Sequence, residues 1–195
     1  MEKETGTKAG VRILAVASGG IDREHAVGKR DVLLVGVVQR QGIVEGIISG
    51  KVTTDGSDST KEIIRIAKGT RFAEQIRIVA LNGIAIAGLN ITEPSRIEKE
   101  LDAKAVIITR ARPRPGKLIM AIKKSRCSKE DRTKKIKLLK TENSRLRTTM
   151  ANGICVQYQN DTGLSKNIIQ SSFEAIRLAH LIARGISTGE SKGRI

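Results

Sequence analysis

The sequence contains few of the residues on which many binding and catalytic sites depend. Only three of its 195 residues are aromatic, Phe72, Tyr158 and Phe173, and none is tryptophan. Because stacking platforms need aromatic faces, a surface that binds bases mainly by stacking is disfavoured. The two cysteines, Cys127 and Cys155, stand far apart, and only two histidines accompany them. That spacing argues against a zinc site or a disulfide framework and favours two reduced structural thiols.

Long apolar runs are absent as well. No segment approaches the roughly 20 consecutive apolar residues that a membrane-spanning helix needs. Residues 1–10 hold no apolar stretch of the kind found in secretory signals. We therefore expect a cytoplasmic protein with no membrane partner. Neither a P-loop nor a serine-centred nucleophile elbow is apparent, so nucleotide hydrolysis by a P-loop and serine-hydrolase chemistry are unsupported.

Acidic residues are too few to balance the basic ones. The chain has 36 Lys and Arg against 20 Asp and Glu, which gives a formal net charge of +16. Such an excess favours a polyanionic partner, because cations that neutralise phosphates release the counterions condensed on nucleic acid. DNA is the expected partner and RNA the second choice, while the oligomeric state is left open. With so few aromatic residues, we expect the contacts to be mainly ionic.

The basic residues are most concentrated in residues 110–147. This segment carries 15 Lys and Arg against three acids, and Pro113 and Pro115 favour an extended entry to it. We expect a basic helical arm that grips phosphates. The same pattern is typical of a solvated helical face that packs on a sheet, and the two roles are compatible. The residues expected to contact nucleic acid are Arg110, Arg112, Arg114, Lys117, Lys123, Lys124, Arg177, Lys192 and Arg194.

The order of strand and helix patterns indicates an α/β fold. Apolar runs predict strands at 11–17, 31–39 and 43–54, and the turn at Gln41-Gly42 predicts a hairpin, so three antiparallel strands open the chain. Further strands are expected at 76–81, 105–109 and 154–159, and helices at 59–70, 94–101, 117–126, 129–147, 163–171 and 174–187. Alternating strands and helices predict parallel βα units with helices on both faces of a mixed sheet. This order resembles that of RNase H-like domains.

The predicted elements suggest one domain with short extensions. Residues 1–10 are expected to be a flexible basic N-terminus, residues 11–188 a single domain that includes the arm, and residues 189–195 a polar tail.

Two aspartates follow the third predicted strand in the stretch TTDGSDST. Asp55 and Asp58 have the oxygen ligands that Mg²⁺ prefers, and carboxylates at strand ends hold the metal in nucleases of this architecture. Structural roles are the alternative: Asp58 or Ser59 could cap the following helix, with Ser59 and Glu62 forming a capping box. Asp55 could equally form an Asx-turn. Both interpretations stay open.

The end of the chain holds a second group of candidates. Glu174, Arg177 and His180 recur at i, i+3 spacing and so share one face of the last helix. An acid, a base and an imidazole in a line would suit phosphate orientation and proton transfer. A local ion pair beside a packed histidine is the plain alternative. Glu190, near Lys192 and Arg194, is either a mobile ligand or a solvated charge.

Five stretches together resemble the archaeal endonuclease dU family, which is similar to endonuclease V and has an RNase H-like fold. They are RILAVASGG, VTTDGSDSTKEII, RIVALNGIAIAGLNI, VIITRARPRP and FEAIRLAHLIARGISTGESKGR, and they span about Val11 to Arg194. The resemblance implies an endonuclease that uses Mg²⁺ or Mn²⁺ to cleave DNA containing deoxyuridine or a related deaminated base.

The resemblance also implies roles for particular residues. Asp55 and Asp58 match the aspartate pair after the third strand, while Glu174, Arg177 and His180 match the final-helix motif and Glu190 the tail motif. By this comparison Asp55, Asp58, His180 and Glu190 are the expected catalytic residues, and Asp55, Asp58 and Asn82 the expected metal ligands. Asn82 stands where endonuclease V has aspartate.

One departure from the family pattern concerns the first strand. The family's first strand usually ends in paired aspartates before glycine, but this chain has Ala17 and Ser18 there. Alanine offers no oxygen and serine only a neutral one, although Asp22 lies nearby in the loop. Two hypotheses therefore remain: an active metal-dependent endonuclease, and a nucleic-acid-binding relative that has lost its metal site.

Overall fold

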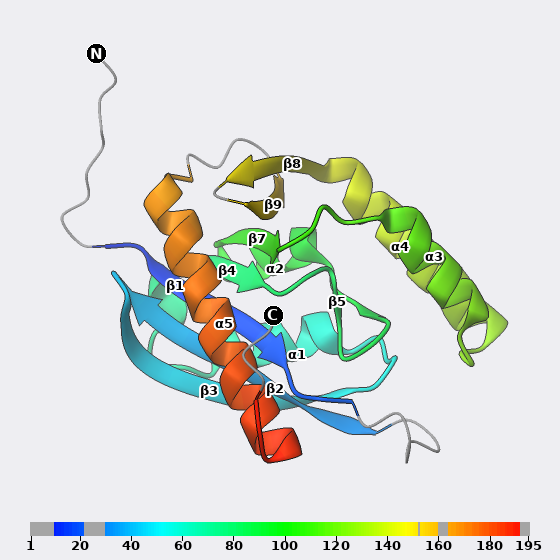
Figure 1. Cartoon of the computed structure of the whole chain (residues 1–195), viewed down its shortest axis with the longest axis horizontal. Coiled ribbons are helices and arrows are strands. Elements are labelled where there is room, and N and C mark those ends of the chain that lie inside the picture. Colours follow the sequence, from blue (N-terminus) through cyan, green and yellow to red (C-terminus); the bar gives the residue numbers. More distant parts are fainter. Residues whose placement is uncertain (1–9, 22–29, 152, 160–163, 192–195) are drawn as a thin grey trace.

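The structure, a computed structural model, describes residues 10–21, 30–151, 153–159 and 164–191. A mixed seven-stranded sheet lies between helices on its two faces (Figure 1). The strands are β1 (Arg12–Ser18), β2 (Asp31–Arg40), β3 (Ile43–Thr53), β4 (Ile76–Leu81), β5 (Ala85–Ile86), β6 (Asn90–Ile91), β7 (Lys104–Thr109), β8 (Leu146–Ala151) and β9 (Ile154–Gln159). The helices are α1 (Ser59–Lys68), α2 (Pro94–Leu101), α3 (Pro115–Lys124), α4 (Lys129–Arg145) and α5 (Lys166–Thr188), with a 3₁₀ turn at Ala73–Gln75.

The strand order in the large sheet is β3-β2-β1-β4-β7-β9-β8. β1, β2 and β3 are antiparallel, and the β2–β3 turn places Gln41 and Gly42 at φ 52° and 82°, as a two-residue hairpin turn of type I′ requires. β4 and β7 run parallel to β1. At the far edge of the sheet, β9 is antiparallel to β7 and β8 is antiparallel to β9. The predicted α/β fold is confirmed: three antiparallel strands precede parallel βα units in a mixed sheet with helices on both faces.

Alternating side chains along the central strands supply two cores. On one face of β1, Leu14 and Val16 pack with residues of α1, α2, α3 and α4. Ile13 and Ala15, which point to the other face, pack beneath α5 together with β7 and β9. Figure 1 shows α5 lying alone across this second face. None of the described helices is long and apolar enough to cross a bilayer.

The structure differs from the predicted elements in three places. The helix expected at 129–147 ends at Arg145, because Leu146–Ala151 pairs with β9 as the edge strand β8. The helices expected at 163–171 and 174–187 are one helix, α5, whose apolar side chains continue across the expected break. The short β5–β6 hairpin, at Ala85–Ile91, had no sequence signal strong enough to predict it.

The predicted capping box at the start of α1 does not form. Glu62 instead accepts a hydrogen bond from the Lys51 amide at 3.2 Å and pairs with Arg65. The Asp58 side chain makes no capping bond to α1. Both acids are drawn toward β3, because α1 packs directly on that strand and offers its side chains closer partners than its own first turn.

A buried acid in the basic arm holds that arm to the sheet. The Glu142 carboxylate, only 1% exposed, accepts hydrogen bonds from the Ser95 amide at 3.1 Å and the Ser95 hydroxyl at 2.6 Å. Gln159 of β9 donates to the same carboxylate at 3.2 Å. Because Ser95 lies in the first turn of α2, Glu142 satisfies one of that helix's open amides from the side of α4. The arm is therefore packed on the domain along α4.

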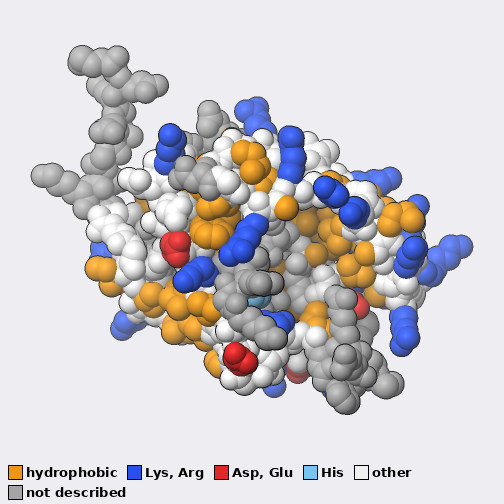
Figure 2. Space-filling view, in the orientation of Figure 1, with side chains coloured by type: hydrophobic (Ala, Val, Ile, Leu, Met, Phe, Trp, Pro, Cys, Tyr) orange, Lys and Arg blue, Asp and Glu red, His pale blue; other side chains and the backbone are white. Residues whose placement is uncertain are grey.

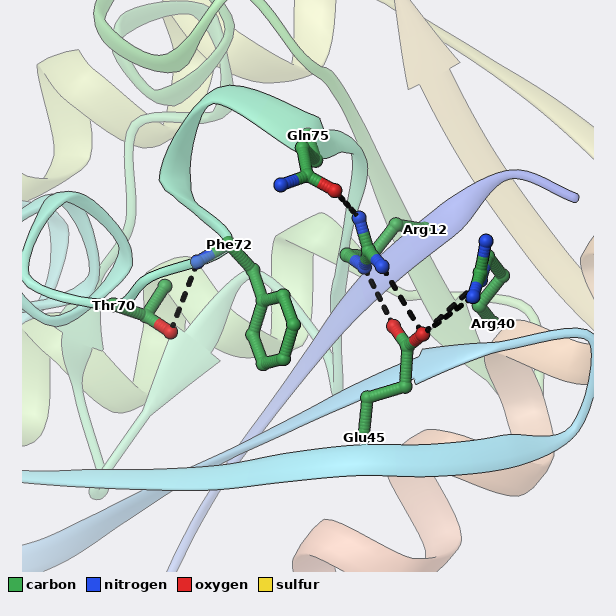
Figure 3. Close-up of polar contacts among 6 residues, drawn as sticks. All are labelled: Arg12, Arg40, Glu45, Thr70, Phe72 and Gln75. Carbon is green, nitrogen blue, oxygen red and sulfur yellow. Dashed lines mark hydrogen bonds and ion pairs between the residues drawn. The ribbon is translucent and has the colours of Figure 1, made fainter. Parts of the chain in front are cut away.

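An ion-pair network lies at the N-terminal end of β1 (Figure 3). Arg12 donates to both carboxylate oxygens of Glu45, at 2.6 and 3.0 Å, and to Gln75. Its guanidinium lies 4.7 Å from the centroid of the Phe72 ring, and Arg40 also donates to Glu45. The hydrogen bond from Arg12 holds the pKa of Glu45 below its ordinary value. This network has no candidate site residue in it, so we assign it to stability.

Candidate functional site

The carboxyl ends of several strands lie along the same border of the sheet, which runs across the strands. β1, β4 and β7 are parallel, so Ser18, Asn82 and the segment after Thr109 all leave the sheet on the same side. β3 also ends there, because it is antiparallel to β2, which in turn is antiparallel to β1. Residues expected for chemistry therefore converge on this edge, as in other α/β proteins whose sites lie outside the carboxyl ends of parallel strands.

Asp55 is held at this edge by the loop of the β5–β6 hairpin. Its amide donates to the Ala87 carbonyl at 3.0 Å, and its carboxylate Oδ1 accepts from the Leu89 amide at 2.7 Å. The same loop reaches β1, since the Ala87 amide donates to the Ser18 hydroxyl at 3.2 Å. A Cβ atom on Gly88 (φ 89°) would lie 2.3 Å from Asp55 Oδ1, so only glycine fits between them. We call Ser18, Asp55 and Ala87–Leu89 the Asp55 edge.

The Asp55 backbone itself has an unusual conformation. Its φ is 51°, in the left-handed region that few residues other than glycine, asparagine and aspartate adopt readily. Its side-chain bond to the Leu89 amide joins it to the hairpin 34 residues ahead and not to its own turn, so the predicted Asx-turn is not what holds it. Asp55 is partly exposed, which leaves its carboxylate within reach of solvent.

The Asp58 carboxylate is held by Thr53 of β3 and Asn90 of β6. Its Oδ2 accepts from the Thr53 amide at 3.1 Å and hydroxyl at 2.8 Å, and its Oδ1 accepts from the Asn90 side chain at 2.6 Å. Burial alone would raise the pKa of the Asp58 carboxyl, but these hydrogen bonds outweigh it and hold that pKa below its ordinary value. A metal-binding role for Asp58 would require these bonds to be given up, and it stays a prediction.

The two positions that depart from the family pattern point in opposite directions. Ala17 is 1% exposed and packs against Ala179 and Ala183 of α5. Ser18, one residue on, turns its hydroxyl toward the Ala87 amide and so toward Asp55. A carboxylate at position 18 would therefore lie on the Asp55 edge, whereas one at position 17 would enter an apolar core.

The far end of α5 also reaches this side of the molecule. The Ser187 hydroxyl accepts from the Gly20 amide at 3.2 Å, just after β1, and Thr188 donates to the Glu190 carbonyl at 2.7 Å. Glu190 is exposed, so the structure brings it to the correct end of β1 without fixing its carboxylate. Lys192 and Arg194 lie outside the described residues.

The remaining candidates of α5 lie nearer to the N-terminus of that helix. Glu174 and Arg177 form an ion pair at 3.8 Å, as the plain alternative expected, and His180 is partly buried one turn on. Thirteen residues separate Glu174 from Ser187, which is about 20 Å at the helical rise of 1.5 Å per residue. Glu174 is thus not brought to the Asp55 edge. Asn82 lies directly after β4, and its backbone N–H donates to the Val16 carbonyl near the end of β1 at 3.4 Å.

The basic arm presents its charges beside the same edge. Figure 2 shows Lys and Arg side chains gathered over α3 and α4. Arg110, Arg112 and Arg114 lie in the connection that leaves β7 at this edge, and they are exposed, as are Lys117, Lys123 and Lys124 of α3. The arm turns back between Ser125 and Ser128, and there the Cys127 thiol lies 3.8 Å from the Asp55 carbonyl.

Sequence reasoning missed Lys135. This lysine of α4 is 3% exposed, and its ammonium donates to the Asp55 carbonyl oxygen and lies 3.7 Å from the Cys127 sulfur. In a helix so rich in lysine, nothing in the composition separates it from its solvated neighbours. One signal was available: Lys135 stands four residues before Leu139, which is fully buried, and so shares its inward face.

Comparison with known proteins identifies the family. The family model for endonuclease dU matches residues 9–187. The chain belongs to the endonuclease dU family.

Its relatives in that family are archaeal proteins of similar length. A UPF0215 protein of Methanosarcina mazei is 32% identical over the full length of both chains. Another from Pyrococcus horikoshii is 33% identical over 83% of this chain and 85% of its own.

Two solved structures match most of the chain. A protein of unknown function from Archaeoglobus fulgidus is 24% identical, with a TM-score of 0.75 over 92% of this chain and 99% of its own. Endonuclease V from Ciona intestinalis, in complex with a 24mer DNA containing an inosine, is 9% identical, with a TM-score of 0.42 over 86% of this chain and 84% of its own.

The described residues of this endonuclease dU protein do not fit a carboxylate-held metal ion of the kind that the resemblance implies. Within the described ranges, no three His, Cys, Asp or Glu side chains are placed to hold one. Ala17 brings no oxygen, and the Ser18 hydroxyl already accepts a hydrogen bond. Asp55 and Asn82 are the donors that remain at the edge.

Matched substitutions of the two aspartates should separate their roles. Asp58→Asn should lower the free energy of unfolding by about 1–2 kcal/mol, because an amide cannot accept from all of its present donors. Asp55→Asn should cost less than about 0.5 kcal/mol, since asparagine tolerates positive φ and its oxygen can keep the Leu89 bond. Urea denaturation of both variants measures the difference. Equal losses would contradict the structural role given to Asp58.

Proposed function

We propose that this endonuclease dU protein binds DNA along its basic arm, with the Asp55 edge as the place where the bound strand meets the sheet. The observation that carries the proposal is the run of exposed cations that leaves β7 beside that edge and continues along α3. The β7–α3 connection contributes three arginines and the arm contributes the exposed lysines of α3. Spaced cations of this kind suit a chain of phosphates better than a single small anion.

The scarcity of aromatic residues supports a phosphate-centred mode of binding. Phe72 packs between Arg12 and Arg71 at the opposite end of β1, so its ring is occupied there. Tyr158 of β9 and Phe173 of α5 are partly buried against the core between the sheet and α5. Contacts to the sugar–phosphate backbone should therefore dominate the affinity, and a base would be distinguished at the Asp55 edge itself. In a binding experiment, RNA of the same length as the DNA serves as the competing ligand.

The salt dependence of binding tests this assignment. The double variant Lys123→Met/Lys124→Met should reduce the slope of log K against log salt by about 0.9 for each duplex phosphate that the variant no longer neutralises. Lys99→Met, an exposed lysine of α2 close to the start of β7, should leave the slope unchanged. Fluorescence anisotropy with a labelled duplex at several salt concentrations measures both. Equal slopes for the two variants and the wild type would rule out the arm as the binding surface.

Cleavage of deoxyuridine-containing DNA with Mg²⁺ or Mn²⁺ is the second candidate function. Membership of the endonuclease dU family favours it, and so does the Asp55 carboxylate at the carboxyl end of the central strands. His180 and Glu190 remain candidates for proton transfer and for a further carboxylate. Against it stands position 18, where a neutral hydroxyl replaces the charge that a nuclease of this type would bring beside Asp55.

A carboxylate supplied at position 18 tests how far cleavage depends on that charge. Ser18→Asp should nick a duplex with one deoxyuridine at least about tenfold faster than the wild type in Mn²⁺ or Mg²⁺, because it adds an anionic metal ligand. Ala17→Asp should give no such gain and should destabilise the protein, because it buries a carboxylate among apolar side chains. A gel-based nicking assay and a thermal melt of each variant measure these effects.

Each result of the nicking assay has a distinct meaning. Wild-type nicking that is abolished in Asp55→Asn, with binding retained, would establish cleavage without a first-strand carboxylate. A silent wild type with an active Ser18→Asp variant would identify a binding protein derived from a nuclease. Activity in Ala17→Asp but not in Ser18→Asp would contradict the orientation assigned to these two residues.

A further inference from the structure

Lys135 differs from the other described cations of the arm in being buried. It lies inside the protein, where an ammonium group is costly unless it is paired or hydrogen-bonded. Among the described residues no carboxylate forms an ion pair with it, and its partners are the Asp55 carbonyl and the Cys127 sulfur. The Lys135 ammonium therefore stabilises the Asp55 carbonyl and does not interact mainly with solvent.

The main chain of Asp55 adopts a conformation that contacts from outside its own turn stabilise. Asp55 is at φ 51°, and its amide and carboxylate are both held by the β5–β6 hairpin. Its carbonyl, which points to the other side, is held by Lys135 and approached by the Cys127 thiol. The hairpin fixes Asp55 from the sheet, and α4 fixes it from the arm.

We propose that Lys135 is a positioning residue that locks the basic arm to the Asp55 main chain, so that a strand gripped by the arm is presented to the Asp55 edge. The effect on a bound strand rests on the proposed function, because it requires DNA to be held by the arm. Lys135 itself contacts no phosphate. It acts through Asp55 and through the seating of the turn that carries Cys127.

A pair of substitutions in the same helix isolates this role. Lys135→Met and Lys137→Met remove the same charge and introduce the same side chain, but Lys137 is exposed. Hydrogen exchange of the amides of residues 53–58 is the first readout, with no DNA present. It should become at least about tenfold faster in Lys135→Met and should not change in Lys137→Met.

Binding to the deoxyuridine duplex is the second readout. Lys135→Met should weaken the affinity at least about fivefold while the slope against salt stays that of the wild type, because no phosphate contact is removed. Lys137→Met should change the affinity only through its slope. If Lys135→Met lowers the slope instead, Lys135 contacts phosphate directly and the positioning role is overturned.

The two readouts keep this inference separate from the proposed function. If the wild type does not bind DNA with a steep salt dependence, the proposed function fails, and the exchange rates alone decide whether Lys135 anchors Asp55. Equal exchange at residues 53–58 in the two variants would overturn the anchor whatever the DNA result. Faster exchange with unchanged affinity would likewise overturn the positioning role, because anchoring would then have no effect on the bound strand.

Discussion

The hydrogen bonds around the main chain of Asp55 are the constraint on which the candidate site depends. Three separate parts of the chain meet there: the end of β3, the β5–β6 hairpin and α4. Ala87 links the same point to Ser18 of β1. Each contact restrains a backbone that glycine or aspartate tolerates but most residues do not. The sheet alone would bring these strands to one edge, but it would not seat the basic arm beside them.

The sheet order explains why the site lies where it does. Parallel β1, β4 and β7 deliver Ser18, Asn82 and the arginine-rich connection to one edge, and α5 returns its end to the same place. Charge on this edge comes from Asp55 on the acidic side and from the arm on the basic side. A surface with one fixed carboxylate and many cations is better suited to holding a phosphate chain than to holding a metal ion unaided.

Much of this was predictable from sequence, for physical reasons that also set the limit. Period-two and helical apolar patterns gave the sheet and most helices, because burial on one face imposes those periods. β8 was missed because its pairing with β9 is what makes Leu146–Ala151 a strand. The spacing of Asp55 and Asp58 flagged both, yet only the folded contacts separate an aspartate held at the edge from one bound by Thr53 and Asn90. Burial of Lys135 depends on the seating of α4 and has no local pattern.

Hydrogen-exchange protection of the wild type by a duplex with one deoxyuridine would test the central claim most directly. We predict protection in three segments that are distant in sequence: residues 53–58, 85–91 and 110–128. The amides at the N-terminal end of β1, near Arg12, lie at the other end of the strand and should exchange as they do in the free protein. Protection at the Arg12 end, or none in residues 53–58, would contradict the assignment of the Asp55 edge as the place where DNA is bound.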